Sequence, residues 1–219
     1  MTQESAQKKE ALISLVQEQA NTYLKQPLSS GVMAALKKVP REEFGGTWEN
    51  QPCPIGYGQT ISQPFMVAVM TELICQYSPK HEKVGEIGGG SGYQAAILSD
   101  FFDRVITIER HRPLAERAQK VLAKQAINNV TVQYGNGGDL QEQGLDALMV
   151  TCGVVGKIAE KWLNSLVEQG VLLLPYAASE SEGLEIVCMR KKQGVLQKIA
   201  ALKQPLTCRF VPFINQEDS

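Results

Sequence analysis

The chain has 219 residues, of which 43% are hydrophobic and 21% are charged, and its formal net charge is -1. This length and composition suit a single domain, residues 1–219, with one sizeable core. The charge balance lacks the basic excess of proteins that bind nucleic acids or anionic membranes. No stretch approaches the roughly 18 apolar residues that cross a membrane, so we expect a cytoplasmic protein without a membrane partner.

Residues 1–78 are predicted to form helices and a loop that precede the central core. Apolar residues recur at helical spacing over 12–24 and again over 32–39, where a proline follows and stops the helix. A segment rich in glycine and proline occupies 45–58. A third helix is predicted to begin at Pro64, because proline is favoured at the first helical positions.

Residues 79–176 alternate between apolar runs and helical patterns. This alternation is typical of an α/β fold in which helices cover both faces of a mostly parallel sheet. The predicted strands are Lys83–Ile87, Arg104–Glu109, Val130–Tyr134, Asp146–Thr151 and Val171–Pro175, and the predicted helices start at about Tyr93 or span 113–127 and about 157–167. Residues 177–219 are predicted to add antiparallel edge strands near 184–189, 195–200 and 210–214.

The most informative stretch is Val84–Tyr93, which reads VGEIGGGSGY. Only glycine lets a chain turn tightly out of a strand and lie against a ligand. The next predicted strand ends in Glu109, where a carboxylate can accept hydrogen bonds from ribose hydroxyls. Together these features indicate a site for a nucleoside cofactor.

Glu86 distinguishes between two cofactors that fit this motif. The stretch GSGYQA at 90–95 also satisfies the dinucleotide pattern, with an acid 19 residues after Gly90, which keeps NAD open. A carboxylate two residues before Gly88 favours the cationic methionine moiety of S-adenosyl-L-methionine, since it would repel a pyrophosphate. We therefore expect S-adenosyl-L-methionine as the cofactor and S-adenosyl-L-homocysteine as the product.

Ligands of parallel sheets bind beyond the carboxyl ends of the strands. The loops expected there carry the glycine motif and the stretches ER at 109–110, GNGG at 135–138 and CG at 152–153. The predicted cofactor-binding residues are Glu86, Gly88, Gly89, Gly90, Ser91, Gly92, Glu109, Arg110, Asn136 and Gly137. The five cysteines are scattered and form no Cys-x-x-Cys pair, so we expect free thiols and no metal site.

Two segments outside this core resemble the protein-L-isoaspartate (D-aspartate) O-methyltransferase family. They are KVPREEF at 38–44 and PIGYGQTISQP at 54–64, and the resemblance extends over about 12–212. It implies the Rossmann-like fold of S-adenosylmethionine-dependent methyltransferases, with a loop that closes over the methyl donor. By this resemblance Ser62 is the active-site residue, Thr60 helps to shape the donor pocket, and the partners are damaged proteins that bear isoaspartyl residues.

The resemblance also implies the reaction, methylation of the carboxylate of L-isoaspartyl and D-aspartyl residues, which initiates their repair through a succinimide. No general base is required, because a carboxylate with a pKa of about 4 is already ionised at neutral pH. Three alternatives stay open: a small-molecule methyltransferase, an NAD-dependent oxidoreductase and a degenerate homologue that serves as a nucleoside-binding module. We expect the repair enzyme, acting as a monomer.

Four positions depart from the family's pattern. Asn136 replaces the aspartate of the family's Gly-Asp-Gly, and Gly89 replaces a threonine or serine. Gly85 replaces a large apolar residue, and Gly138 replaces a residue that has a side chain. Each extra glycine costs roughly 0.5 to 1 kcal/mol in a regular element. A neutral amide is expected to bind adenine about 1 kcal/mol more weakly than a carboxylate. We expect a loosened site, and the sequence leaves its activity open.

Several candidate residues have a purely structural alternative. Ser62 directly precedes the start of a predicted helix and could cap it. Glu109 could stabilise the start of the following helix through the helix dipole. Arg209 either attracts an anionic substrate or is a solvated surface residue. His111 is expected to be a surface residue at a helix start.

Overall fold

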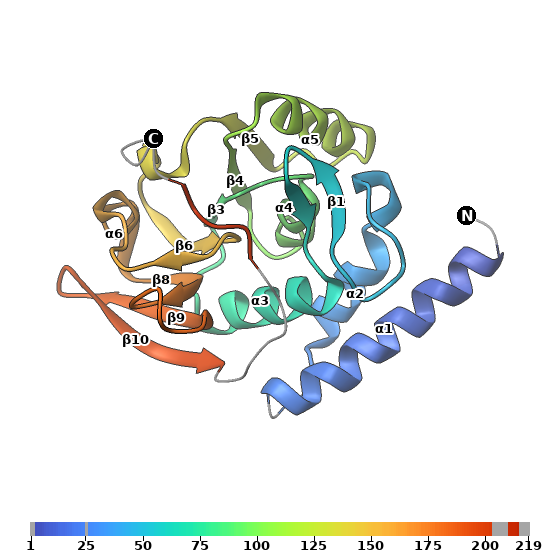
Figure 1. Cartoon of the computed structure of the whole chain (residues 1–219), viewed down its shortest axis with the longest axis horizontal. Helices are drawn as coiled ribbons and strands as arrows, with labels where there is room; N and C mark the ends of the chain where they lie inside the picture. Colours follow the sequence, from blue (N-terminus) through green and yellow to red (C-terminus); the bar gives the residue numbers. More distant parts are fainter. Residues whose placement is uncertain (1–2, 25, 203–209, 215–219) are drawn as a thin grey trace.

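The computed structural model describes residues 3–24, 26–202 and 210–214, and its centre is an eight-stranded sheet (Figure 1). The strand order is β10-β9-β8-β6-β3-β4-β5, and the short β7 pairs with β8. Strands β8, β6, β3, β4 and β5 are parallel, and β9 and β10 are antiparallel at one edge, as predicted. The strands of this sheet are β3 (Lys83–Ile87), β4 (Arg104–Glu109), β5 (Val130–Tyr134), β6 (Leu145–Val150), β7 (Val154–Val155), β8 (Leu166–Ala177), β9 (Glu185–Lys192) and β10 (Val195–Leu202).

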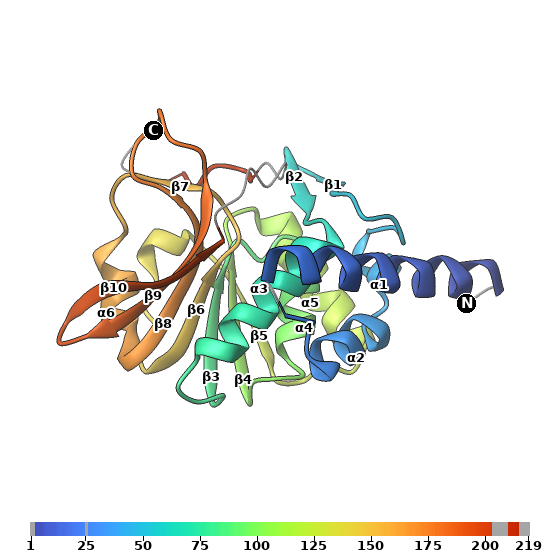
Figure 2. The ribbon, with the colours of Figure 1, turned by 90° about the horizontal axis from the view of Figure 1, so that it is seen from below.

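Most of the helical residues lie on one side of the sheet (Figure 2). The N-terminal helix packs on α3 through an apolar stripe that includes Leu12, Val16 and Ala20, which confirms the predicted helix face. The elements on this side are α1 (Gln3–Leu24), α2 (Ser30–Lys38), the 3₁₀ helix η1 (Arg41–Phe44), α3 (Pro64–Tyr77), α4 (Tyr93–Leu98) and α5 (Arg112–Lys124).

The opposite face is covered by α6 (Glu160–Ser165), by the short 3₁₀ helix η2 (Gly137–Asp139) and by the last described segment. Trp162 is fully buried there and meets Phe213 edge to face, with ring centroids 5.0 Å apart. The helix predicted over about 157–167 is longer than the observed α6, which spans only Glu160–Ser165. It stops early because β8 begins at Leu166, whose pairing with β6 extends the sheet instead.

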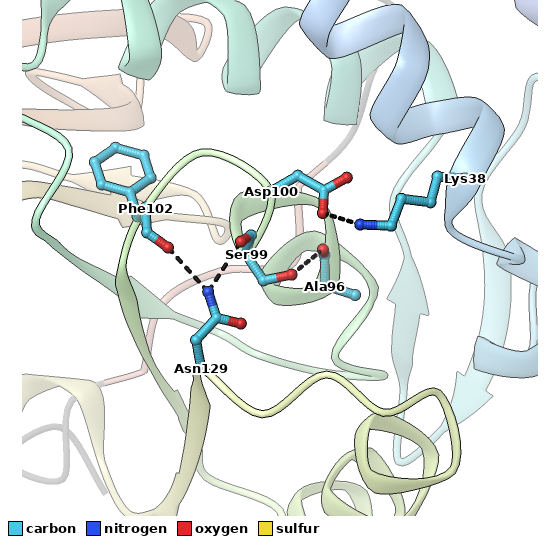
Figure 3. A network of polar contacts seen from close by, with 6 residues as sticks. All are labelled: Lys38, Ala96, Ser99, Asp100, Phe102 and Asn129. Atoms are coloured by element: carbon cyan, nitrogen blue, oxygen red, sulfur yellow. Dashed lines mark hydrogen bonds and ion pairs between the residues drawn. The ribbon is translucent and has the colours of Figure 1, made fainter.

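A network of polar contacts fixes the end of α4, the helix that follows the glycine motif (Figure 3). The Nδ2 of Asn129 donates hydrogen bonds to the carbonyls of Ser99 and Phe102, each at 2.9 Å. At the end of α2, Lys38 forms an ion pair with Asp100. These contacts satisfy carbonyls that a helix leaves unpaired at its C-terminus, and they hold α4 between α2 and β5.

The segment 210–214 does not form the predicted antiparallel edge strand. It makes an isolated parallel bridge, in which Gly153 donates to the carbonyl of Val211 and accepts from the amide of Phe213, both at 2.8 Å. Packing of the partly buried Phe213 against Trp162 explains this placement, since an edge strand would leave that ring in water. The segment thus lies at the carboxyl ends of the central strands (Figure 1).

Within the described residues, no helix is long and apolar enough to span a bilayer. That part of the chain also contains no group of histidine, cysteine and acidic side chains arranged to hold a metal ion. Its cysteines, Cys53, Cys75, Cys152 and Cys188, are free thiols. Cys208 lies outside the described residues.

Candidate active site

Two cavities open at the carboxyl ends of the parallel strands, beside the hairpin of β1 (Cys53–Gly56) and β2 (Gln59–Ile61). The larger has a volume of about 290 Å³ and the smaller about 230 Å³. Residues that line both cavities are Gln59, Gly88, Glu109, Cys152 and Val211. The two cavities are therefore halves of one crevice between the glycine motif, the hairpin and the segment 210–214.

The glycine motif forms the floor of this crevice because its backbone takes left-handed turns. Gly88, Gly90 and Gly92 have φ angles of 93°, 52° and 83°, a region that other residues rarely adopt. A Cβ at Gly88 would lie 2.5 Å from the hydroxyl oxygen of Thr151, so this position also excludes a side chain. Gly92 lines neither cavity. It starts α4, and a Cβ there would meet Ala118 at 3.1 Å.

Glu109 lies where the two cavities meet, and its side chain is 4% exposed. Its Oε1 accepts a hydrogen bond from the amide of His111 at 2.7 Å, and its Oε2 accepts one from the amide of Gly90 at 2.8 Å. The carboxylate thus does contact the start of α5, as the structural alternative holds, and it also faces the crevice. An ionised carboxylate offers about four acceptor positions, which leaves two for a ligand.

Glu86 is a buried acid on β3 whose side-chain oxygens have no hydrogen-bond partner in the described part of the chain. Burial raises the pKa of Glu86 to about 8; Thr107 on β4 opposes this rise, and the charge of Glu109 adds to it. Glu86 also lines the larger cavity. A cationic ligand group in that cavity would supply the partner that the carboxylate lacks.

The stretch around Asn136 forms one wall of the smaller cavity. The Oδ1 of Asn136 accepts a hydrogen bond from the amide of Gly138 at 3.1 Å and so caps η2. Trp162 donates from Nε1 to the carbonyl of Gly137 at 2.8 Å. A Cβ at Gly137 would lie 2.2 Å from Ile87, so only glycine fits there. Because a carbonyl oxygen has two lone pairs, Asn136 can still accept a bond from a ligand.

Ser62 lines the larger cavity and does not cap the helix that follows it. The N-cap of α3 is Gln63, and the amide of Phe65 is instead bound by the Oδ1 of Asn50 at 3.0 Å. The Ser62 hydroxyl makes no hydrogen bond within the described residues, and its carbonyl accepts one from Arg41 at 2.8 Å. The capping alternative for Ser62 is therefore wrong, and its hydroxyl is available to a ligand.

The crevice brings together most of the site residues predicted from the sequence. The larger cavity is lined by Thr60, Ser62, Glu86, Gly88, Gly89, Gly90, Ser91 and Glu109. The smaller cavity is lined by Gly88, Glu109, Arg110, Asn136 and Gly137. Arg209 lies outside the described residues.

Sequence reasoning missed an aromatic pair at the rim of the smaller cavity. Tyr57 is 57% exposed at the tip of the β1–β2 hairpin, and its ring stacks on His111 with centroids 5.4 Å apart. Both residues line the smaller cavity, and His111 lies at the start of α5 as its N-cap residue, which confirms the expected helix start. The Gly-Tyr-Gly pattern signals a tight turn, but it does not reveal which element the ring contacts.

Cys152 lines both cavities without being a candidate nucleophile. Burial raises the pKa of the Cys152 thiol to about 12, so the group stays protonated at neutral pH. Since the thiolate is the reactive form of cysteine, Cys152 contributes a wall of the crevice and no covalent chemistry.

Comparison with known proteins agrees with this geometry. The family described as protein-L-isoaspartate(D-aspartate) O-methyltransferase (PCMT) matches residues 7–218. A protein-L-isoaspartate O-methyltransferase from Shewanella sp. (strain ANA-3) is 39% identical over 194 residues, which cover 85% of this chain and 87% of that protein. One from Aeromonas hydrophila subsp. hydrophila is 36% identical over 210 residues, covering 92% and 98%. The chain belongs to this family. The resemblance seen in the sequence is confirmed.

Two solved structures of PCMT proteins have the same fold as this family member. A putative protein-L-isoaspartate O-methyltransferase from Plasmodium falciparum, in complex with S-adenosyl-L-homocysteine, has a TM-score of 0.78 at 18% identity, with coverage of 94% of this chain and 98% of that one. Another protein-L-isoaspartate O-methyltransferase has a TM-score of 0.75 at 25% identity and coverage of 93% and 65%. The methyltransferase fold predicted from the sequence is confirmed.

Proposed function

We propose that this PCMT family member methylates the carboxylate of L-isoaspartyl and D-aspartyl residues in damaged proteins, with S-adenosyl-L-methionine as the methyl donor. The observation that carries this proposal is the continuity of the crevice. It joins a glycine motif suited to a nucleoside with Ser62, whose hydroxyl has no partner within the described residues. A donor and an acceptor can therefore meet in one place.

The residues of the crevice fit the separate parts of the donor. Glu86 lacks a cation, which the ammonium group of the methionine moiety would provide. Glu109 keeps acceptor positions for ribose hydroxyls. Asn136 lines the smaller cavity, where its side-chain oxygen can accept a hydrogen bond from the amino group of adenine.

When bound, the donor supplies a methyl group that its sulfonium already activates. The remaining tasks of the chain are to orient the acceptor and to exclude water. We assign to the Ser62 hydroxyl a hydrogen bond to one oxygen of the acceptor carboxylate, which leaves the other oxygen to attack. The larger cavity also has apolar walls from Ile61, Met66 and Phe210, which keep water away from this oxygen.

The decisive experiment compares an isoaspartyl peptide with its aspartyl twin as acceptors of a radiolabelled methyl group. We expect transfer to the isoaspartyl peptide alone. Calorimetry with S-adenosyl-L-homocysteine, S-adenosyl-L-methionine and NAD accompanies it. Tight binding of the nucleoside without transfer to any acceptor would identify a binding module, and transfer to free small molecules instead of the peptide would identify a small-molecule methyltransferase.

We also propose that the monomer is the active unit. The crevice of one chain already holds Glu86 and Glu109 for the donor and Ser62 for the acceptor, so the proposed reaction needs no residue from a second copy. Size-exclusion chromatography with light scattering, together with a specific activity that does not change on dilution, tests this proposal. The cytoplasmic location stays a prediction from the sequence.

A further inference from the structure

Arg41 is a fully buried cation to which no described carboxylate forms an ion pair. Burial lowers the pKa of its guanidinium from the usual value, and Tyr93 and Cys53 partly offset this effect. A buried charge is costly unless its donors are hydrogen-bonded. An apolar side chain would fill the same space at less cost, so the donors of Arg41 need an explanation.

The Nε and Nη2 donors go to the segment that leads to the crevice, whereas Nη1 has no hydrogen-bond partner among the described residues. The Nε of Arg41 donates to the carbonyl of Thr47 at 3.1 Å, and Nη2 donates to the carbonyls of Gln51 and Ser62 at 3.4 Å and 2.8 Å. The shortest of these bonds is the one to Ser62. One planar guanidinium thereby fixes both ends of the chain stretch that forms the β1–β2 hairpin.

Two further contacts fix the guanidinium itself. Its Cζ lies 5.1 Å from the centroid of the Tyr93 ring. Tyr93 is the first residue of α4 and lines the larger cavity. A Cβ at Gly46 would lie 2.6 Å from Cγ and 2.7 Å from Nε of Arg41, so the absence of a side chain there leaves room for the arginine. Arg41 therefore connects the Ser62 segment with the helix that follows the glycine motif.

We propose that Arg41 is a positioning residue that fixes the Ser62 peptide and thereby directs the Ser62 hydroxyl at the acceptor carboxylate. This inference rests on the proposed function. The neighbouring peptide is also held, because Gln63 donates from Nε2 to the carbonyl of Asn50 at 2.9 Å. With both peptides fixed, the direction of the Ser62 side chain depends on the bond from Arg41, and a small displacement of a group that orients substrate lowers the rate strongly.

A double-mutant cycle on methyl transfer to an isoaspartyl peptide tests this role. Arg41→Lys keeps the charge but cannot bind three carbonyls in one plane. We expect it to lower kcat about tenfold or more and to change the affinity for S-adenosyl-L-homocysteine less than about twofold. In the Ser62→Ala background the same substitution should lower kcat less than about twofold further, because the oriented hydroxyl is already absent.

Two other variants serve as controls. Arg190 is part-buried and, like Arg41, donates to a backbone carbonyl, that of Tyr77 at 3.0 Å, so Arg190→Lys should lower the melting temperature and leave kcat unchanged. Gly46→Ala displaces the Arg41 side chain without removing it, and it takes the place of Arg41→Lys in the cycle if that variant does not fold.

The outcomes separate the inference from the function on which it rests. An equal fold-loss of kcat in the wild-type and Ser62→Ala backgrounds, or a loss of nucleoside affinity as large as the loss of kcat, overturns the positioning role alone. A wild-type kcat in Ser62→Ala overturns both the assignment of Ser62 and this inference, while methyl transfer stands. A wild-type chain that methylates no isoaspartyl peptide overturns the proposed function and the inference with it.

Discussion

The Ser62 hydroxyl lacks a partner within the described residues because Asn50 takes over the capping of α3. Replacing this serine by alanine should therefore lower methyl transfer without unfolding the helix. For Ser62→Ala we expect kcat to fall about tenfold or more, with the melting temperature and the affinity for S-adenosyl-L-homocysteine unchanged. Radiolabel transfer, circular dichroism and calorimetry measure these three quantities.

The matched control is Ser14→Ala, which removes an exposed hydroxyl on α1 that donates to the carbonyl of Glu10. It should behave as wild type in all three measurements. An unchanged kcat with a lower melting temperature in Ser62→Ala would show instead that this hydroxyl has a structural role.

Glu86 predicts a dependence of nucleoside affinity on pH. Its pKa of about 8 means that the free protein holds this group neutral at lower pH. An ammonium group of the ligand favours the ionised form, so binding should release a proton, and affinity for S-adenosyl-L-homocysteine should rise from pH 6 to about 8 and then level. Calorimetry in buffers of different ionisation enthalpy counts the proton. Glu86→Gln should bind more weakly and without this dependence.

The raised pKa of Glu86 also predicts how the stability of the fold depends on pH. Because the pKa of Glu86 is raised from 4.5 in folding, the folded chain binds more protons than the unfolded chain between these two values. Its contribution to stability is therefore greatest below pH 4.5 and is lost as the pH rises to about 8. If the free energy of unfolding differs between wild type and Glu86→Gln by the same amount at every pH from 4.5 to 8, the raised pKa of Glu86 is contradicted.

Helix α3 depends on a residue from another segment for its N-terminal hydrogen bond. Asn50 accepts from Phe65 through Oδ1 and donates through Nδ2 to Gln19 of α1 at 2.7 Å, so one side chain ties two helices together. Asn50→Ala should lower the free energy of unfolding by about 1 kcal/mol, the usual value of a cap. Urea unfolding measures this, and Asn50→Asp, which keeps the acceptor oxygen, should lose less. Equal losses in both variants would show that the bond to Gln19 dominates.

Asn136, which replaces the family's aspartate, caps the 3₁₀ helix η2, and this role bears on the effect of restoring the aspartate. An aspartate there would keep the cap on Gly138, since its carboxylate also accepts from that amide. We expect Asn136→Asp to bind S-adenosyl-L-homocysteine about 1 kcal/mol more tightly, through a charge-assisted bond to the adenine amino group. Repulsion from Glu109 opposes this gain. Calorimetry decides, with deamidation of the wild type excluded by peptide mass mapping, and equal or weaker binding would contradict the expectation.

The packing of the whole sheet accounts for two of the glycines that depart from the family's pattern. A Cβ at Gly85 would lie 2.9 Å from the side chains of both Leu145 and Leu148 on β6. A Cβ at Gly89 would lie 2.3 Å from the hydroxyl oxygen of Thr107. Neighbouring strands thus fill the space that a larger residue would occupy, so neither glycine leaves a void.

Restoring a large residue at Gly85 should therefore destabilise the fold. We expect Gly85→Leu to cost about 1–3 kcal/mol or more through overpacking, measured by urea unfolding. The triple variant with Leu145→Ala and Leu148→Ala should recover part of this loss because it reopens the space. A Gly85→Leu chain as stable as wild type would show that the leucines of β6 rearrange at little cost.

Local signals in the sequence were sufficient for most elements and for placing the glycine motif and Glu109 at the carboxyl ends of neighbouring strands. The bounds of β3, β4 and β5 match the predicted strands because each is a short apolar run ended by glycine or by polar residues. The glycine motif and Glu109 were identified for a related reason, since a strand, a tight turn and an acid at the next strand end follow one another along the chain.

The sequence by itself determined the fold class, the family and the residues of the glycine motif, because these depend on neighbours in the chain. Only the tertiary structure decided how Ser62, Arg41 and the segment 210–214 act. Asn50 rather than Ser62 caps α3, and Arg41 donates across 21 positions to the Ser62 carbonyl. The contact of the partly buried Phe213 with Trp162 places the segment 210–214 at the crevice. Such contacts join residues distant in the chain, so no local pattern encodes them.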